Sequence, residues 1–293
     1  MTKTRILIIG IGGVGGYFGG ILAKEYREND DIEVYFLSRG ENKRKIESEG
    51  IRIFDDGNEF IAHPDLVSDN ANDFGIVDYV LICTKTYSLN EIAQQISSCV
   101  NDSTVLVPLQ NGVNSRDILL KSFPSNLITN GCVYLVSRLE SPGIIRKNGQ
   151  VGSLFFGLNK VNDSRLNSLH KILIESGIKS ELSSNIDKIT WEKFIFLSSI
   201  ATATTFFNSN IQGILENSQE LSALKSLIGE VTELANSKEI QVENKQVERV
   251  LGILASLPPE ATTSMHSDFQ NKNAQTELES LTGFVVEEGR WST

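Results

Sequence analysis

A glycine-rich segment close to the start of the chain has a spacing that suits phosphate binding. Residues 10–15 read GIGGVG, a G-x-G-x-x-G pattern that follows a short apolar run and opens a helical one. In such a loop the first glycine makes a tight turn, the second admits a pyrophosphate and the third allows close packing of the helix. The residues expected to contact a dinucleotide are Gly10, Gly12, Gly13, Val14 and Gly15. The alternative, a glycine-rich turn without a ligand, leaves the seven glycines of residues 6–23 unexplained.

Two polar residues at the end of the next apolar run indicate which dinucleotide is bound. An NAD enzyme usually has a carboxylate at this point, hydrogen-bonded to the 2′-hydroxyl of the ribose. Here the run ends at Ser38 and Arg39, and a guanidinium can bind a 2′-phosphate with two hydrogen bonds while a serine adds another. NADPH or NADP⁺ is therefore the expected cofactor. The alternative is that Arg39 is solvated in a charged loop with Glu41, Lys43 and Arg44.

Two further polar residues, Lys85 and Asn111, follow the apolar runs at residues 77–84 and 104–109. Open α/β sheets bind ligands beyond the carboxyl ends of their strands, so both side chains are expected to face the cofactor and the substrate. A cation at Lys85 would also offset the net charge of −10 for an anionic ligand. Asn111 precedes Gly112, and without a ligand the pair is an ordinary turn.

The elements that must position these residues follow an alternation of short apolar runs and helical patterns. Such alternation predicts a parallel sheet covered by helices, and a helix is expected over residues 14–26. The predicted buried strands are residues 5–9, 32–37, 77–84 and 104–109. Strands expected to close the edge of this domain are residues 131–136, 143–146 and 150–156.

From residue 186 onward the pattern becomes helical. Apolar side chains recur there at i, i+3, i+4 and i+7, over residues 221–235 and again over residues 247–257. The pair Pro258-Pro259 is expected to end the second of these helices and to open the next one. No alternation typical of strands interrupts this part of the sequence.

A division into two domains follows from these patterns and from the length of 293 residues. The predicted fold class is α/β, with an N-terminal Rossmann-type dinucleotide-binding domain over residues 1–184 and an all-helical C-terminal domain over residues 185–293. The polar residues 183–185 are the expected joint. A hydrophobic content of 40% with 22% charged residues excludes disordered and fibrous classes.

Charge and residue content exclude several partners. A net charge of −10 disfavours nucleic acid and anionic membrane surfaces, because both require a basic face. The three cysteines form no C-x-x-C pair, which fits a reducing cytoplasm, and the three histidines lack the spacing of a zinc site. The uncharged residues 6–23 contain too much glycine for a membrane helix or a signal peptide. We expect a soluble, cytoplasmic protein without a metal.

Seven short motifs occur along the chain in a characteristic order. They are the G-x-G-x-x-G at residues 10–15, Arg39, CTK at 83–85, QNG at 110–112, WEKF at 191–194, TELE at 276–279 and TGF at 282–284. With this order and spacing the chain resembles the ketopantoate reductase (2-dehydropantoate 2-reductase) family over most of its length. The resemblance implies a Rossmann domain joined to a helical domain with the active site in the cleft between them.

The resemblance also implies roles for individual residues. Lys193 matches the family's catalytic lysine, which would protonate the oxygen of a reduced ketone, and Glu277 matches its substrate-binding glutamate. Lys85 and Asn111 match residues near the nicotinamide and the substrate, and Ser264 is similar to a substrate-contacting serine. Without the resemblance, Lys193 is equally well interpreted as a lysine that reaches water along an apolar helix, and Glu277 as part of a solvated acidic face.

The implied activity is the NADPH-dependent reduction of ketopantoate to pantoate, for pantothenate and coenzyme A synthesis. Two departures from the family concern the substrate. Leu197 and Ala201 replace asparagines that the family often has after the lysine, and residues 287–293 end the last helix early. Reduction of another 2-keto acid, or NADP(H) binding by a sensor without turnover, are therefore alternatives. A hydroxyacid or glycerol-phosphate dehydrogenase would share the first domain but not the pattern around Glu277. A homodimer is one assembly that the sequence allows.

Overall fold

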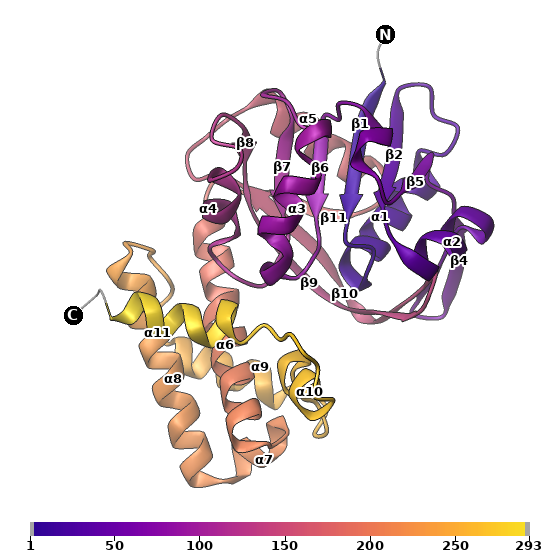
Figure 1. Ribbon diagram of the computed structural model, residues 1–293. Helices are drawn as coiled ribbons and strands as arrows, with labels where there is room; N and C mark the ends of the chain where they lie inside the picture. Colours follow the sequence, from indigo (N-terminus) through magenta and orange to yellow (C-terminus); the bar gives the residue numbers. More distant parts are fainter. Residues whose placement is uncertain (1–2, 291–293) are drawn as a thin grey trace. The chain divides into compact units, whose positions relative to one another are not determined.

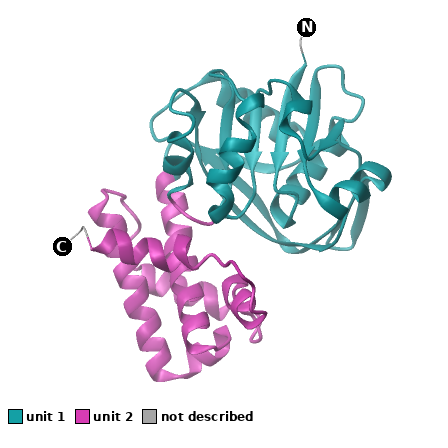
Figure 2. Cartoon of the chain, viewed as in Figure 1, with its two compact units in different colours: residues 1–110, 114–186 teal, residues 111–113, 187–293 magenta. Residues whose placement is uncertain are grey.

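The structure is a computed structural model that describes residues 3–290 and contains two compact units. Unit 1 comprises Met1–Gln110 and Asn114–Ile186, and unit 2 comprises Asn111–Val113 and Asp187–Thr293 (Figure 2). The chain therefore leaves unit 1 for three residues, returns to it, and enters unit 2 finally after Ile186. The predicted joint at residues 183–185 lies just before this crossing. Binding of the dinucleotide by the first part and of the substrate by the second stays a prediction. The expectation that residues 287–293 end the last helix early extends past the described residues, because 291–293 lie outside them.

The main sheet of unit 1 is parallel throughout and contains the predicted buried strands (Figure 1). Its strands are β1 (Thr4–Ile9), β2 (Ile32–Leu37), β5 (Leu66–Ser68), β6 (Tyr79–Ile82), β7 (Val105–Pro108) and β8 (Leu127–Ile128). Their order is β5-β2-β1-β6-β7-β8. Continuous apolar runs form these strands because both faces of a parallel sheet are covered.

Helices cover both faces of the main sheet. They are α1 (Gly13–Glu25), α2 (Gly40–Glu49), α3 (Leu89–Gln95), α4 (Ser115–Leu120) and α5 (Ser164–Glu175), with 3₁₀ turns η1 (Ala71–Phe74), η2 (Thr86–Ser88) and η3 (Ser97–Cys99). Successive side chains of a strand point to opposite faces. In β1, Ile6 therefore packs into the core that contains α1 and α5, and Leu7 packs into the core that contains α3 and α4.

The strands expected to close the edge of this domain belong instead to a second sheet of unit 1. It contains β3 (Ile51–Asp55), β4 (Asn58–Ala62), β9 (Asn130–Ser141), β10 (Ile144–Gly157) and β11 (Lys179–Leu182). The prediction of separate strands at 143–146 and 150–156 is wrong, since one long strand spans both ranges with a register shift between Lys147 and Gly152. The apolar pattern of a run indicates that its side chains are buried, but it does not show with which strand the run will pair.

Helix α1 packs against both sheets, and this explains the glycines beyond the loop. A Cβ on Gly19 would lie 2.9 Å from a ring carbon of Phe36 in the main sheet. A Cβ on Gly16 would lie 2.5 Å from the Ile145 side chain in the second sheet. Larger residues would hold the sheets apart, so the glycine face of α1 allows two sheets to approach one helix.

A buried charged group also joins α1 to the second sheet. The phenol of Tyr17 donates to Asp55 Oδ2 at 2.8 Å, and Lys147 Nζ donates to Asp55 Oδ1 at 2.6 Å. The Lys147 side chain is only 6% exposed. Burial, together with the neighbouring Asp55 carboxylate, raises the pKa of the Tyr17 phenol. The phenol therefore stays protonated as a donor at neutral pH, and the group fixes α1 against strands β3 and β10.

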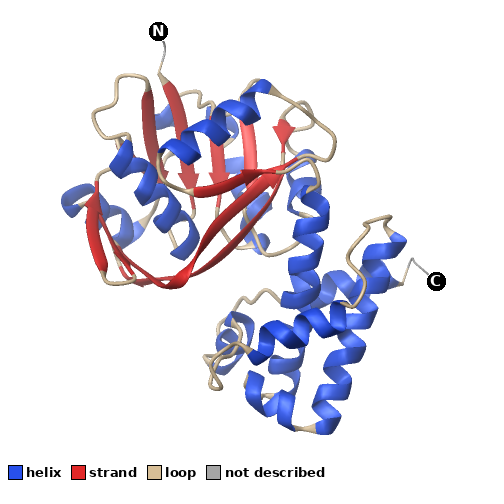
Figure 3. Cartoon of the chain, turned by 180° about the vertical axis from the view of Figure 1, so that it is seen from behind, coloured by secondary structure: helices blue, strands red, loops and turns tan. Residues whose placement is uncertain are grey.

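The described part of unit 2 consists of helices and loops (Figure 3). Its elements are α6 (Ile186–Phe207), α7 (Ile211–Glu216), α8 (Ser218–Ser237), α9 (Gln246–Ala255), α10 (Ser264–Gln270), the π-helical turn η4 (Glu279–Gly283) and α11 (Phe284–Gly289). The predicted apolar repeats form α8 and α9. Together with the parallel sheet of unit 1, these helices confirm the predicted α/β fold class with a helical second part. None of the helices within residues 3–290 combines the length and apolarity needed to cross a bilayer.

The prediction that Pro258-Pro259 opens a helix is wrong. Helix α9 ends at Ala255, and α10 begins only at Ser264. Thr263 caps α10 instead, because its side-chain oxygen accepts a hydrogen bond from the backbone N–H of His266 at 3.2 Å.

Candidate active site

The carboxyl ends of neighbouring strands bring together the residues expected to bind the cofactor. Gly10 follows β1, Ser38 follows β2 and Cys83 follows β6, and these three strands are adjacent in the sheet. The backbone N–H of Cys83 donates to the carbonyl of Ile9 at 2.8 Å, so pairing continues to the first glycine of the loop. β1 lies where the strand order reverses, which is the position at which α/β sheets bind nucleotides.

The glycine loop has the geometry that each position of the motif requires. Gly10 adopts a φ of +83°, and a Cβ there would lie 2.7 Å from the backbone nitrogen of Thr84. A Cβ on Gly15 would lie 3.0 Å from the Cβ of Cys83 and would overlap the carbonyl of Gly10. Gly12 differs, since no heavy atom lies within 4 Å of a Cβ built on it. The space beside Gly12 is thus open in the protein and available to a phosphate group.

The N-terminus of α1 is suited to an anion. Gly12 precedes the helix with an extended backbone and no side-chain cap, and the first turn contains no acidic residue. The N–H groups of Gly13, Val14 and Gly15 therefore have no partners within the helix, and the helix dipole adds positive charge at this end.

Buried polar atoms beside the loop also fit a dinucleotide. Thr84 Oγ1, Gln110 Oε1 and Ser137 Oγ are buried and have no hydrogen-bond partner among residues 3–290. Ser137 lies at the loop, since its Oγ is 2.8 Å from the position of a Cβ on Gly13. Buried polar atoms need partners, and the hydroxyls and phosphates of a cofactor could supply them. Sequence analysis assigned no role to Thr84 or Ser137. Thr84 lies two residues after β6, within the CTK motif, whereas Ser137 comes from the second sheet and carries no local signal.

Arg39 has no competing partner in the described part of the chain. Its side chain is exposed at the N-terminus of α2, and no ion pair joins it to another residue of 3–290. Lys43, by contrast, pairs with Glu47 at 2.9 Å. Ser38 is 8% exposed, and its backbone N–H donates to the carbonyl of Ser68 at 2.9 Å. The guanidinium of Arg39 is therefore available to an anionic ligand. Lys85 lies after β6, where it precedes the 3₁₀ turn η2.

Lys193 and Asn111 lie together in unit 2. Lys193 Nζ donates to Asn111 Oδ1 at 3.0 Å in a part-buried environment, although the residues are 82 positions apart in sequence. Lys193 is in the first half of α6, and Asn111 is in the segment that leaves unit 1. Val113 anchors that segment because it packs against the core of unit 2 that includes Phe194. The amide oxygen of Asn111 therefore orients the ammonium group of Lys193.

Glu277 is buried, unlike its acidic neighbours. Its exposed fraction is 2%, whereas Glu279 and Glu287 are exposed. The interpretation of Glu277 as part of a solvated face is therefore wrong. Its carbonyl accepts from the Leu281 N–H at 3.0 Å and from the Ser280 hydroxyl at 3.1 Å, where the chain enters η4. Single π-helical turns that run into an α-helix are frequent at functional sites.

Ser264 is not joined to these residues. It is exposed at the first position of α10, and its hydroxyl makes no hydrogen bond to any described residue. Hydroxyl pairs missed by sequence analysis connect α6 to the neighbouring segments: Thr202 with Thr282 at 2.7 Å, and Thr204 with Thr263 at 2.9 Å. The helix of Lys193 is thus tied to the segments that carry Glu277 and Ser264.

The face of α6 that carries Lys193 continues with apolar side chains. Leu197 is one turn further along and partly exposed, and Ala201 is 1% exposed within the core of unit 2. Neither offers a hydrogen bond to a ligand. Within the described ranges no group of three His, Cys, Asp or Glu side chains could hold a metal ion.

His266 is buried close to Ser264 and is hydrogen-bonded through both ring nitrogens. Its Nε2 is 2.9 Å from Asn208 Oδ1 and its Nδ1 is 2.6 Å from Thr262 Oγ1. An amide oxygen only accepts, so Nε2 carries the hydrogen and Nδ1 accepts from the threonine hydroxyl. Burial lowers the pKa of His266 below its ordinary value, because the imidazolium is poorly solvated there.

We expect this histidine to make the protein sensitive to acid. The unfolded chain takes up a proton near the ordinary pKa of about 6.5, but the folded chain takes it up only at lower pH. The contribution to stability is therefore complete above about pH 6.5 and is lost as the pH falls toward the lower folded pKa. Thermal unfolding across this range should show a decline that His266→Asn reduces. A matched His63→Asn variant should retain it, and an unchanged decline in His266→Asn would contradict the assignment.

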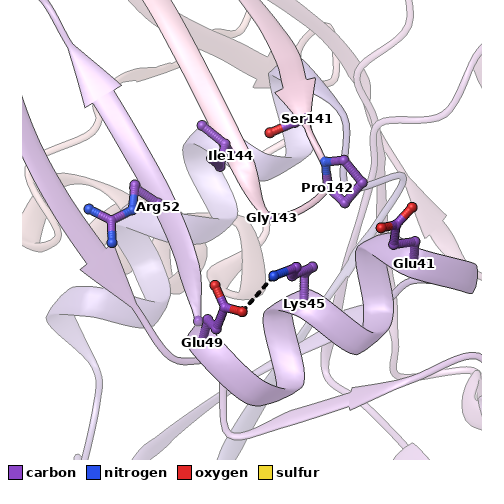
Figure 4. Close-up of a pocket in the computed structure, with 9 residues that line it drawn as sticks. Glu41, Lys45, Glu49, Arg52, Ser141, Pro142, Gly143 and Ile144 are labelled. Atoms are coloured by element: carbon purple, nitrogen blue, oxygen red, sulfur yellow. Dashed lines mark hydrogen bonds and ion pairs between the residues drawn. The ribbon is translucent and has the colours of Figure 1, made fainter.

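A pocket of about 300 Å³ lies elsewhere on unit 1, between α2, β3 and the turn that joins β9 to β10 (Figure 4). Both of its cationic side chains pair with carboxylates of the protein. Lys45 Nζ lies 2.6 Å from Glu49 Oε1, and this hydrogen bond raises the pKa of the lysine. Arg52 pairs with Glu59. None of the residues expected to bind cofactor or substrate lines this pocket.

Comparison with protein families gives two matches that cover most of the chain. A family described as Ketopantoate reductase PanE/ApbA matches residues 6–160, and its C-terminal counterpart matches residues 185–292. The protein called Uncharacterized oxidoreductase YkpB of Bacillus subtilis (strain 168) is 27% identical over 289 residues, which are 98% of this chain and 92% of that protein. The 2-dehydropantoate 2-reductase of Halobacterium salinarum is 24% identical, with the same coverage of both chains.

Solved structures match the fold along nearly the whole chain. The crystal structure of 2-dehydropantoate 2-reductase from Porphyromonas gingivalis W83 is 30% identical, with a TM-score of 0.86, and covers 99% of this chain and 94% of that chain. D-Mandelate dehydrogenase, in its ternary structure with NADH and anilino(oxo)acetate, is 22% identical with a TM-score of 0.83. That match covers 98% of this chain and 92% of the other, and at this identity the likeness concerns the fold alone.

Proposed function

Because the chain belongs to the ketopantoate reductase family of oxidoreductases, we propose that it reduces ketopantoate to pantoate with NADPH. The observation that carries the proposal is the hydrogen bond of 3.0 Å between Lys193 Nζ and Asn111 Oδ1. The family resemblance assigns both residues to the active site, and they lie 82 positions apart in the sequence. Such a contact is expected where a lysine must be held in one orientation for catalysis.

The cofactor would be held by the glycine loop and the end of β2. The open space beside Gly12 and the uncapped start of α1 accommodate the pyrophosphate. Exposed Arg39 and the hydroxyl of Ser38 would bind a 2′-phosphate, because these two residues stand at the end of β2 where an NAD enzyme has a carboxylate for the 2′-hydroxyl. These features support NADPH over NADH.

In the proposed reaction Lys193 acts as the general acid. The cofactor held by the glycine loop would supply the hydride for the carbonyl carbon of the 2-keto acid. As the C=O bond opens, its oxygen gains negative charge and takes a proton from the Lys193 ammonium, giving the 2-hydroxy acid and a neutral amine. Asn111 orients the ammonium by accepting one of its hydrogens. Water then returns the proton to the amine.

Glu277 would bind the substrate through the hydroxyl group of ketopantoate. Glu277 matches the family's substrate-binding glutamate, and at 2% exposure its carboxylate is shielded from bulk water, where a hydrogen bond to a ligand hydroxyl is strengthened. Lys85 and Ser264 would complete the substrate contacts. Pantoate is a precursor of pantothenate and coenzyme A. The reduced state of Cys83, Cys99 and Cys132 supports a location in the reducing cytoplasm.

A second candidate substrate is a 2-keto acid with an apolar side chain. Leu197 follows Lys193 by one helical turn and presents a hydrocarbon group where an amide would bind a hydroxyl. The third possibility, a cofactor-binding sensor without turnover, is less consistent with an ordered lysine and a buried glutamate in the same unit.

A steady-state assay of NADPH oxidation tests the proposal. Ketopantoate, 2-ketoisovalerate and phenylglyoxylate form a matched panel, because only the first carries a hydroxyl group. We expect the highest kcat/KM with ketopantoate, and at least about tenfold preference for NADPH over NADH. A higher kcat/KM with 2-ketoisovalerate would favour the apolar alternative. Tight NADPH binding without oxidation by any member of the panel would favour the sensor.

A further inference from the structure

Asn42, in the first turn of α2, connects three separate segments of unit 1. Its Nδ2 donates to the carbonyl of Ile11 at 3.1 Å and to Ser38 Oγ at 3.3 Å. Its Oδ1 accepts from the backbone N–H of Gly143 at 2.8 Å. The amide therefore contacts the glycine loop, the end of β2 and the turn between β9 and β10.

Two of these partners fix the orientation of the amide. The carbonyl of Ile11 can only accept a hydrogen bond, and the N–H of Gly143 can only donate one. The nitrogen of the Asn42 side chain must therefore face Ile11, and the same nitrogen faces Ser38. Ser38 Oγ is consequently an acceptor toward Asn42, and its own O–H hydrogen is directed elsewhere.

The turn that contacts Asn42 is also hydrogen-bonded to strand β3. Gly143 has a φ of +77°, and its carbonyl accepts from the backbone N–H of Arg52 at 2.8 Å. Figure 4 shows Gly143 at the turn facing helix α2. The second sheet therefore sets the position of Asn42, and Asn42 transmits that position to the end of β2.

We propose that Asn42 is a positioning residue that makes Ser38 a hydrogen-bond donor and so sets the preference for a 2′-phosphorylated dinucleotide. With Asn42 in place, the hydrogen bond from its amide occupies one lone pair of Ser38 Oγ and turns the O–H away from Asn42, so that the hydroxyl hydrogen and the Arg39 guanidinium can donate to the oxygens of a phosphate. The 2′-hydroxyl of NADH is better matched by an acceptor. The inference rests on the proposed function, since it assumes that the cofactor binds at Ser38 and Arg39.

Two variants with opposite side-chain chemistry test the inference. Asn42→Ala removes all three hydrogen bonds, and Asn42→Asp keeps an acceptor for Gly143 but offers a carboxylate to Ser38, which must then donate toward it. Dissociation constants for NADPH and NADH are measured by cofactor fluorescence, with thermal unfolding alongside. We expect NADPH to bind about tenfold more weakly to Asn42→Ala and about 50-fold more weakly to Asn42→Asp, with less than about threefold change for NADH.

Ser48→Ala and Arg39→Ala are the matched controls. Ser48 lies on the same helix, and its hydroxyl donates to the carbonyls of Arg44 and Lys45 within that helix, so its variant should bind both cofactors normally. Arg39→Ala should weaken NADPH alone. If both Asn42 variants keep the wild-type ratio of NADPH to NADH affinity while Arg39→Ala lowers it, the inference is overturned. Equal weakening of both cofactors with a lower Tm would also overturn it. If Arg39→Ala leaves the ratio unchanged, the proposed cofactor site is wrong instead.

Discussion

Replacing Lys193 with alanine should lower kcat/KM for ketopantoate by about 1,000-fold, because the oxygen of the reduced ketone then lacks a general acid. The loss should fall on kcat more than on the KM for NADPH, since the loop residues that hold the cofactor are unchanged. Lys193→Arg should not restore activity, because a guanidinium remains protonated at neutral pH. Stopped-flow measurement of NADPH oxidation would separate the chemical step from product release.

Lys188→Ala is the matched control for this prediction. Lys188 lies on the same helix and pairs with Glu243 at 3.4 Å and with Glu192 at 3.8 Å, so it tests the loss of a cation from α6 without loss of the proposed acid. Its kcat/KM should stay within about threefold of the wild-type value, because partly exposed ion pairs contribute little. If Lys193→Ala retains more than a tenth of the wild-type turnover, Lys193 is not the proton donor.

Gly12→Ala should abolish tight cofactor binding without unfolding the protein. A Cβ on Gly12 has no heavy atom within 4 Å, and the φ of −100° is accessible to alanine. The Tm should therefore stay close to that of the wild type. The methyl group would nevertheless occupy the space in which a pyrophosphate approaches the backbone, so we expect NADPH affinity to fall by about 100-fold.

The next glycine provides the contrast. A Cβ on Gly13 would lie 2.7 Å from the carbonyl carbon of Ser137, and backbone cannot move away cheaply. Gly13→Ala should therefore lower the free energy of unfolding by roughly 2 kcal/mol. Calorimetry and cofactor titration of both variants separate the two roles. Normal NADPH binding by Gly12→Ala would show that this loop does not hold the pyrophosphate.

The strands of the main sheet could be predicted because each is a short apolar run buried on both faces. Residues 32–37 illustrate this, since the predicted range and β2 coincide. The second sheet could not be predicted in the same way. Its strand β10 contains Lys147 and a register shift, and the sequence alone does not show that this lysine is buried against Asp55. Identifying a partner strand requires contacts between residues far apart in the chain.

The residues of the candidate site also differ in whether a local pattern identifies them. The loop at residues 10–15 is a local motif, and its glycines have the backbone geometry that the motif requires. Lys193 and Asn111 needed a family resemblance, because no local pattern joins residues 82 positions apart. Asn42 and Ser137 were missed, since an isolated amide or hydroxyl gains a role only when another segment packs beside it. The burial of Glu277 was likewise hidden among exposed glutamates.

The excursion of Asn111–Val113 has a consequence for recombination between relatives. These three residues belong to unit 2, although the chain on both sides of them belongs to unit 1. A chimaera that exchanges everything after Ile186 would keep the tripeptide of the original parent, so Val113 would meet a foreign core and Asn111 a foreign lysine. A functional chimaera should therefore take residues 111–113 and the helices of unit 2 from the same parent.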